Sequence, residues 1–100
     1  MPFPTLDLLR QQCRLDSDNP ADDDLLNTYS RAAIKRAESY LNRRLYESAV
    51  PEDDPDGLLV TDDVALAIML TVGFWYDSRD GQSLPLGFQV LLEPYRFIPL

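Results

Sequence analysis

The chain has 100 residues, which predicts a single domain spanning 1–100 with a modest core of its own. Its 17 acidic and nine basic residues give a formal net charge of −8, which argues against a protein that wraps nucleic acid, because phosphate binding needs clustered lysine and arginine. The sequence has no histidine and only Cys13 as a cysteine, so the usual general base, the commonest metal ligand and an intrachain disulfide are excluded.

The acidity and the N-terminal residues bear on where the protein works. A charge of −8 either serves solubility or suits a surface that lines a channel and repels the DNA passing through it. Residues 1–4 lack the basic and apolar regions of a secretion signal, so we expect the chain to stay in the compartment where it is made.

A short helix is predicted near the N-terminus, opened by Pro4 and Thr5. Asp7 falls in its first turn, where the helix dipole favours negative charge. Its apolar positions are Leu6, Leu8, Leu9 and Cys13. Residues 15–20 then form a loop, because Asp and Asn offer local hydrogen bonds to the backbone and a residue before proline disfavours the helical conformation.

Residues 21–45 are predicted to form a long amphipathic helix. Three acids open it, and Arg43 and Arg44 lie near its end, in agreement with the helix dipole. The predicted apolar arc consists of Leu25, Leu26, Tyr29, Ala32, Ala33, Ala37, Tyr40 and Leu41. The opposite polar stripe consists of Asp24, Arg31, Lys35, Glu38 and Asn42, which we interpret as facing solvent.

Arg36 projects into the apolar arc of this helix, near Leu25 and Tyr29. A guanidinium there must either extend outward to water along its aliphatic stem or pair with a carboxylate, which could belong to another chain. The sequence leaves both possibilities open.

Residues 46–60 form the longest irregular segment, with prolines and a glycine around the acids of residues 52–56. Aligned with a calcium-binding loop, the segment would begin at Glu52 and end at Asp63. That alignment fails at both ends, where Asp and Glu are required, and Pro55 stiffens its middle. We therefore predict an ordinary solvated acidic loop without a metal.

A central core helix is predicted at residues 61–79, because positions 64–76 are apolar except for Thr71 and Gly73. The thirteen positions span roughly 20 Å, too little to cross a membrane. Gly73 costs helix stability, which predicts the close approach of another helix backbone there. The signals at the two ends of the helix are Thr61, Asp62, Asp63 and Arg79.

The chain ends with a short helix and an apolar tail. Pro85 is predicted to be the first residue of the helix, and Pro94 is predicted to end it. Residues 95–100 then either fold back, with Phe97 and Ile98 closing the end of the bundle, or insert into a partner as an extended arm. The whole pattern predicts an all-α fold, a bundle of three to four helices around the central helix.

Three short blocks follow one another at close spacing in the second half of the chain. They are Trp-Tyr-x-x-Arg at 75–79, Leu-Pro-x-Gly at 84–87 and Leu-Leu-x-Pro-Tyr-Arg at 91–96. Together with Leu9-Arg10, Leu15-Asp16, Leu25-Leu26, Ala32-Ala33, residues 40–43 and residues 65–70, they resemble the phage head-tail connector family, also described as DNA-packaging or adaptor proteins of long-tailed phages. The resemblance covers nearly the whole chain, although longer members carry a longer insertion in place of residues 46–60.

The resemblance implies a structural protein, not an enzyme, with no catalytic residue, cofactor or metal. Identical subunits would form a ring, dodecameric on the portal, that extends the DNA channel and joins head to tail. The implied partners are further copies of the chain, the portal protein and the next connector or tail-completion protein, with DNA passing through unbound and no membrane. The implied location is the virion neck, reached from the host bacterial cytoplasm, for a phage or a prophage.

Candidate interface residues follow from the same resemblance. A head-to-tail ring brings unlike surfaces together, so we expect Arg36 and Arg43 to face acids of an adjacent subunit. The expected acids are Asp22, Asp23 and Asp24, or residues 52–56. The residues expected to dock into the portal or a neighbouring subunit are Tyr95, Arg96, Phe97 and Ile98.

A core cluster is predicted at Trp75, Tyr76 and Arg79, because residues three and four apart share a helix face and a guanidinium can lie over both rings. The alternative is that both rings belong to the core and the arginine only caps the helix.

Two other classes of protein compete with a connector. A small hydrolase could bind a divalent metal through residues 22–24 or 52–56, but acids are favoured at a helix N-terminus and in a solvated loop without any chemistry. A helical interaction module, such as an antitoxin or adaptor with no phage role, would share the acidity and the tail. It would be a monomer or dimer and not a ring.

Overall fold

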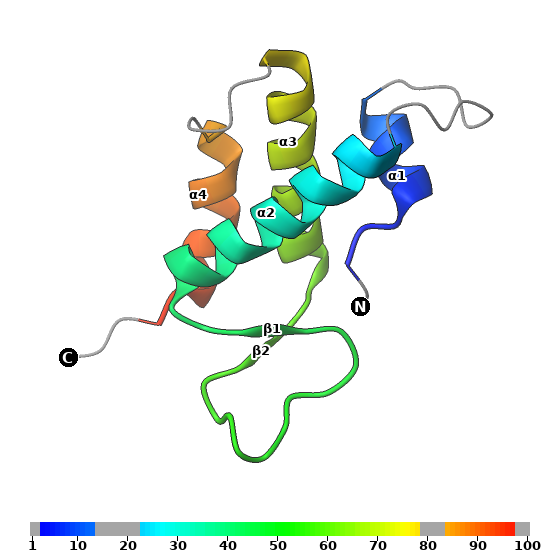
Figure 1. Cartoon of the computed structure of the whole chain (residues 1–100). Coiled ribbons are helices and arrows are strands. Elements are labelled where there is room, and N and C mark those ends of the chain that lie inside the picture. The colour runs from blue at the N-terminus through cyan, green and yellow to red at the C-terminus, as the bar shows by residue number, and fades with distance from the viewer. Residues whose placement is uncertain (1–2, 14–22, 79–83, 98–100) are drawn as a thin grey trace.

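The computed structural model describes residues 3–13, 23–78 and 84–97, which contain four helices and one pair of very short strands (Figure 1). In chain order the elements are α1 Leu6–Gln12, α2 Asp23–Leu41, β1 Leu45–Tyr46, β2 Leu58–Leu59, α3 Asp62–Ser78, α4 Leu86–Leu92 and a 3-10 turn, Glu93–Tyr95. The predicted small helical bundle is confirmed, with the strand pair as an addition. Within the described residues, no helix combines the length and apolar character that a membrane crossing requires.

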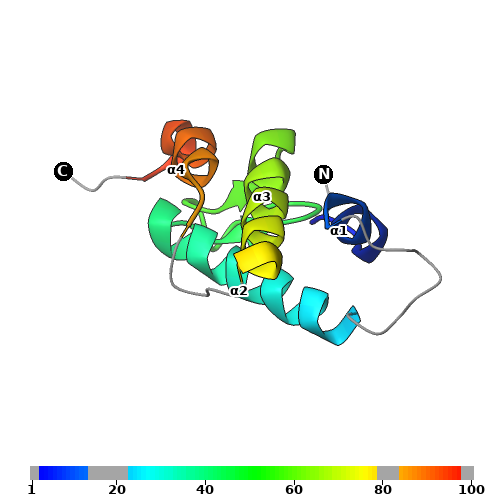
Figure 2. The same cartoon turned by 90° about the horizontal axis from the view of Figure 1, so that it is seen from above.

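The helices form two layers, which Figure 2 shows from above. One layer is α2 alone, which crosses α3 obliquely. The other layer holds α3 in the middle, with α1 on one side of it and α4 on the other. Because α3 contacts all three other helices, it is the element on which the bundle is built.

The central helix α3 lies where the sequence predicts it, within one residue at each end. Thr61 caps it: its hydroxyl oxygen accepts a hydrogen bond from the amide of Val64 at 3.4 Å, and its carbonyl accepts one from Ala65 at 2.9 Å. The residues that α3 buries are Val64, Ala65, Ala67, Ile68, Thr71, Val72, Gly73 and Trp75. The buried hydroxyl of Thr71 donates to the carbonyl of Ala67 at 2.9 Å, so it leaves no unpaired polar group in the core.

The buried face of α2 is made largely of small side chains, which lets the two layers approach closely. Its buried residues are Leu26, Ser30, Ala33, Ala37 and Leu41. The prediction that Ala32 belongs to the apolar arc is wrong, because Ala32 is exposed and Ser30 is buried in its place. Ser30 lies near the middle of the arc that faces α3, whereas Ala32 lies beyond its edge.

Helix α2 ends at Leu41, four residues before the predicted end. Asn42 has a positive φ of 56°, a left-handed conformation that asparagine tolerates better than most residues, and the next amide, Arg43, donates to the carbonyl of Glu38 at 3.4 Å. This is the usual way for a helix to stop at a left-handed residue. It turns the chain toward β1, so Asn42 ends the helix and does not merely face solvent.

Strands β1 and β2 form a parallel pair that the sequence did not predict. Leu45 pairs with Leu58 and Tyr46 with Leu59, and the amide of Leu58 donates to the carbonyl of Arg44 at 2.8 Å. Glu38, predicted to face solvent, accepts a hydrogen bond from the amide of Leu45 at 2.8 Å. Two-residue strands carry no alternating pattern, so only the tertiary structure reveals them.

Helix α1 packs against α3 at Gly73, but through a side chain and not through the predicted helix backbone. A Cβ atom added at Gly73 would lie 3.1 Å from Cγ of Gln12. Thr5 caps α1 by accepting a hydrogen bond from the amide of Leu8 at 3.3 Å, and Leu9 is the residue that α1 buries. Gly73 therefore makes room for the C-terminal end of α1.

Helix α4 runs along α3 and buries Phe88 and Leu92. Pro85 is the N-cap and not the first helical residue, and Pro94 does not end the structure but lies inside the 3-10 turn that continues α4. The ring of Phe88 meets the edge of the Tyr40 ring, with centroids 5.8 Å apart, which joins α4 to α2.

Replacing Trp75 with alanine is expected to lower the free energy of unfolding by about 3–5 kcal/mol, because it removes a large core side chain. Trp75 is only 4% exposed, and its ring lies 5.9 Å from that of Tyr29 in α2. Urea unfolding measures the change. The control is Leu86→Ala, at a residue that is 79% exposed, which should change stability by no more than about 0.5 kcal/mol. An unchanged melting temperature for Trp75→Ala would contradict the packing described here.

Candidate functional site

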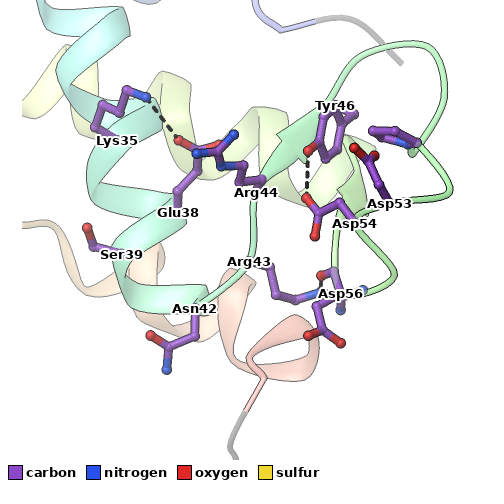
Figure 3. Close-up of a pocket in the computed structure, with 11 residues that line it drawn as sticks. Lys35, Glu38, Ser39, Asn42, Arg43, Arg44, Tyr46, Asp53, Asp54 and Asp56 are labelled. Carbon is purple, nitrogen blue, oxygen red and sulfur yellow. Dashed lines mark hydrogen bonds and ion pairs between the residues drawn. The ribbon is translucent and has the colours of Figure 1, made fainter.

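A polar groove of about 830 Å³ lies between the second half of α2 and the acidic loop that joins the two strands (Figure 3). Its lining residues carry both signs of charge. They are Lys35, Glu38, Ser39, Asn42, Arg43, Arg44, Tyr46, Pro51, Asp53, Asp54 and Asp56. Lysine and arginine come mainly from the α2 side, and three aspartates come from the loop.

The loop that forms one wall of the groove is held by close contacts. The hydroxyl of Tyr46 donates to Oδ2 of Asp54 at 2.5 Å, as Figure 3 shows. The Tyr46 ring also lies where a side chain at Gly57 would be, 2.7 Å from the position of an added Cβ atom. The loop therefore needs glycine at position 57, since any side chain there would push the tyrosine ring away.

Arg43 connects this loop to the C-terminal residues. Its guanidinium donates to the carbonyls of Asp56 at 2.7 Å, Gly57 at 3.1 Å and Tyr95 at 3.1 Å. These are charge-assisted hydrogen bonds to backbone atoms of its own chain. The expected contact of Arg43 with an adjacent subunit stays a prediction. A neighbouring acid would meet a guanidinium that already donates three hydrogen bonds within its own chain.

The groove is not built like a metal site. Among residues 3–13, 23–78 and 84–97, no group of three or more His, Cys, Asp or Glu side chains is placed to hold a metal ion. Two acids of the calcium-loop alignment have other partners, since Asp54 accepts from Tyr46 and Asp63 accepts from the hydroxyl of Tyr95 at 3.0 Å. The groove has the features of a polar contact surface.

The C-terminal residues fold back onto the end of α2. Phe97 donates its amide to the carbonyl of Leu41 at 2.8 Å, and Nε of Arg96 donates to the carbonyl of Tyr40 at 3.1 Å. These contacts satisfy two carbonyls that a helix C-terminus leaves unpaired. The Arg96 guanidinium also lies over the Tyr40 ring, 4.9 Å from its centroid.

Of the four tail residues expected to dock into a partner, three are described. Tyr95 and Arg96 use their polar groups within the subunit, while the side chain of Phe97 is exposed. Ile98 lies outside the described residues. Residues 95–97 therefore lie against their own subunit, as in the alternative in which the tail folds back. Docking into a partner through the exposed Phe97 side chain stays a prediction.

The expected interface acids of α2 lie apart from the groove. Asp23 is paired with Arg10 of α1, whose Nη2 and Nε lie 2.6 and 3.1 Å from its two carboxylate oxygens. Asp24 is exposed, and Asp22 lies outside the described residues. The pairing of Asp23 fixes α1 to the start of α2 and raises the pKa of the Arg10 guanidinium, chiefly through this hydrogen bond.

Arg36 is exposed and has no hydrogen bond or ion pair within the described part of the chain. The sequence leaves two possibilities open for this side chain, and in the single subunit it extends toward water and pairs with no carboxylate of the described residues.

The predicted cluster of Trp75, Tyr76 and Arg79 is described only in part, because Arg79 lies outside the described residues. Trp75 is buried and Tyr76 is half-buried.

Sequence analysis missed several residues that shape these surfaces. The pair of Arg10 with Asp23 joins α1 to α2 across 13 residues of sequence, and the hydrogen bond from Tyr40 to Glu93 joins α2 to the 3-10 turn across 53 residues. No local signal marks such pairs, because the sequence around one side chain does not show which distant side chain will lie beside it. Glu93 raises the pKa of the Tyr40 phenol through this hydrogen bond, which favours the protonated form.

Replacing Arg43 with alanine is expected to lower the free energy of unfolding by about 1.5–3 kcal/mol, because three backbone carbonyls lose a charged donor. The amides of residues 57–60 should also exchange with deuterium faster. Chemical unfolding and hydrogen exchange measure the two effects. Arg44→Ala is the matched control, since Arg44 is exposed beside it. Equal stability of the two variants would mean that Arg43 does not hold the loop and the tail.

Tyr46 provides a pH-dependent test of the loop. The hydrogen bond to Asp54 raises the pKa of the Tyr46 phenol above its ordinary value of 10.0, with burial and the carboxylate charge acting in the same direction. The folded state therefore holds this proton more tightly than the unfolded state. Its contribution to stability is complete below pH 10 and is lost as the pH rises through the higher folded value.

The expected result is that the stability of the native sequence falls more steeply above pH 10 than that of Tyr46→Phe. Chemical unfolding at a series of pH values measures this difference. In a phenolate absorbance titration, Asp54→Asn should let one phenol ionise at a lower pH. Identical pH profiles for the native chain and Tyr46→Phe would refute the role of this hydrogen bond.

Comparison with known proteins agrees with the small helical fold described above. A model of the phage gp6-like head-tail connector protein family matches residues 3–96. Among solved structures, the crystal structure of bacteriophage HK97 gp6 is similar in fold, with a TM-score of 0.66 and 19% sequence identity over 92% of this chain and 91% of that one. A search of curated proteins gave no match.

The match spans nearly the whole chain, including all of the helices described above. The family is structural and not enzymatic, in agreement with the prediction of a protein without catalysis. The chain belongs to the phage gp6-like head-tail connector protein family.

Proposed function

We propose that the chain is a connector subunit that assembles into a ring beneath the portal of a filled phage head. The ring extends the DNA channel and offers a platform for the next connector or tail-completion protein. The observation that carries this proposal is the family match over residues 3–96, with the fold similarity to HK97 gp6 as support. Each subunit works in the virion neck after assembly in the host cytoplasm.

The charge of the chain fits a channel through which DNA passes without being bound. The net charge is −8, and the acidic loop places three aspartates along an open groove. Like charges on the wall and on the DNA phosphates disfavour adhesion, which lets DNA slide during ejection. The same surface offers polar contacts to a neighbouring protein.

We place portal docking at the exposed side of Phe97, together with Ile98. The backbone of residue 97 is tied to the end of α2, which fixes where this aromatic side chain is presented. An aromatic residue whose backbone is already fixed loses little conformational entropy on binding. Aromatic residues are also common among those that contribute most of the binding free energy of an interface.

Attachment to the portal tests the proposed function. DNA-filled heads that carry the portal but lack connectors, from the phage or prophage that encodes the chain, are mixed with the purified protein and imaged by electron cryo-microscopy. We expect a ring of added density beneath the portal and none on capsids that lack a portal. Light scattering after size-exclusion chromatography gives the size of any ring in solution.

A protein that stays monomeric and adds no density to portal-bearing heads would contradict the proposal. A protein that binds portal-free capsids equally well would also contradict it, because the contact would then not depend on the portal.

A further inference from the structure

An apolar surface remains open on the side of α3 that faces away from α2. We call it the apolar face, and it consists of Leu66, Leu70 and Phe74 of α3 with Leu86 and Val90 of α4. Leu66 is 44% exposed, Phe74 37%, Leu86 79% and Val90 64%. Within each helix the residues are four apart, so they lie on one side. Apolar side chains gathered in this way mark an interaction surface.

The two parts of the apolar face adjoin each other. The side chain of Leu70 lies against α4 at Gly87, where an added Cβ atom would be 3.0 Å from its Cδ1. Gly87 is next to Leu86 in sequence and three residues before Val90. Trp75 points from α3 toward α2, as its contact with Tyr29 shows, and the stripe of Leu66 and Leu70 lies on the opposite side of the helix.

Acidic residues surround the apolar face. Asp63 precedes Leu66 by three residues and Asp77 follows Phe74 by three, so each acid lies beside one of its apolar members. Both acids are exposed, although Asp63 also accepts a hydrogen bond from the hydroxyl of Tyr95 at 3.0 Å. Helices α3 and α4 contain no lysine or arginine, so no cation within these two elements offsets the negative rim.

The outer face of α2 has the opposite character. It exposes Arg31, Lys35 and Arg36 around the small side chain of Ala32. Their partners within the subunit are weak: Lys35 lies 3.6 Å from Glu38, and Arg31 donates to the hydroxyl of Thr28 at 3.4 Å. Arg36 has no such partner in the described part of the chain. The aliphatic stems of these cations can cover apolar surface while their charged ends reach acids.

These two faces lie on opposite sides of the subunit, because α2 forms one layer and α3 and α4 belong to the other (Figure 2). A head-to-tail ring needs two unlike faces of this kind. In a ring of about twelve subunits, successive copies turn by only about 30°, so the two contact faces of each subunit lie nearly opposite each other.

We propose that a second copy of the chain covers the apolar face, with the outer face of its α2 packed on Leu66, Leu70, Phe74, Leu86 and Val90. Its cations lie toward the acidic rim, and Ala32 permits close packing. This inference rests on the proposed ring and specifies which two surfaces close it. It moves the partners of Arg36 from the acids of residues 22–24 and 52–56 to Asp63 and Asp77 of α3.

Two variants test the inference, each of which disables one face. Leu86→Asp/Val90→Asp places charge in the apolar face at two highly exposed positions, and Lys35→Glu/Arg36→Glu reverses the charge of α2. We expect each variant alone to self-associate at least about tenfold more weakly than the native chain in analytical ultracentrifugation. A mixture of the two should form one-to-one dimers and nothing larger, because it has one intact pair of complementary faces.

Two control variants carry the same kinds of change, an exposed leucine replaced by an acid and an added negative charge, at positions outside the two proposed contact faces. Leu59→Asp in β2 and Ser48→Glu in the acidic loop should assemble as the native chain does. Circular dichroism and melting curves establish that each variant is folded. Leu86→Ser/Val90→Ser repeats the test without buried charge if the aspartate variant melts at a lower temperature.

The outcomes separate this inference from the proposed function. If the native chain forms rings, in solution or on portal-bearing heads, and both variants do so equally well, the inference is overturned and the ring stands. Variants that form rings but fail to attach to the portal assign the apolar face to the portal and also overturn it. A mixture that stays monomeric shows that the two faces do not meet. A native chain that forms no ring even on the portal overturns both proposals.

Discussion

The burial of α3 is the constraint on which the rest of the structure depends. An almost uninterrupted apolar helix is stable in water only if other elements cover it, since each buried aliphatic side chain contributes roughly 1.5–3 kcal/mol. Here α2 crosses one side and α1 and α4 take the flanks. The alanines of α2 and Gly73 of α3 shorten the distance between these elements, and the positions of all four helices follow from that packing.

The second connection lies at the C-terminal end of α2, where the loop and the tail meet. Asn42 ends the helix in a left-handed conformation, and the amide of Phe97 and the guanidinium of Arg96 pair with its last carbonyls. Arg43 then donates to both the loop and Tyr95. Segments that are far apart in sequence are therefore fixed to one helix end, because unpaired backbone groups there are costly and nearby donors satisfy them.

The packing around α3 has a consequence for assembly. Three helices around a fourth leave one of its sides uncovered, and the exposed Leu66 and Phe74 of α3 lie on that side with the half-buried Leu70 between them. A monomer has nothing in its described residues to place there. In the proposed ring a neighbouring subunit supplies the missing cover, which would explain why a connector carries more apolar surface on this helix than its own fold can bury.

The sequence by itself determined where the helices form and which catalytic groups the chain lacks. The period of the apolar residues and the capping residues placed α3 within one residue at each end, and the lack of histidine excluded the usual base. Only the tertiary structure decided which side of α3 is covered, that Ser30 and not Ala32 is buried, that two short strands pair, and that Arg43 binds backbone carbonyls. The physical reason is that helix formation depends on neighbours in sequence, whereas a helix that is apolar on every side carries no mark of which side will meet a partner. Polar pairs such as Arg10 with Asp23 likewise depend on distances that exist only once the helices have packed.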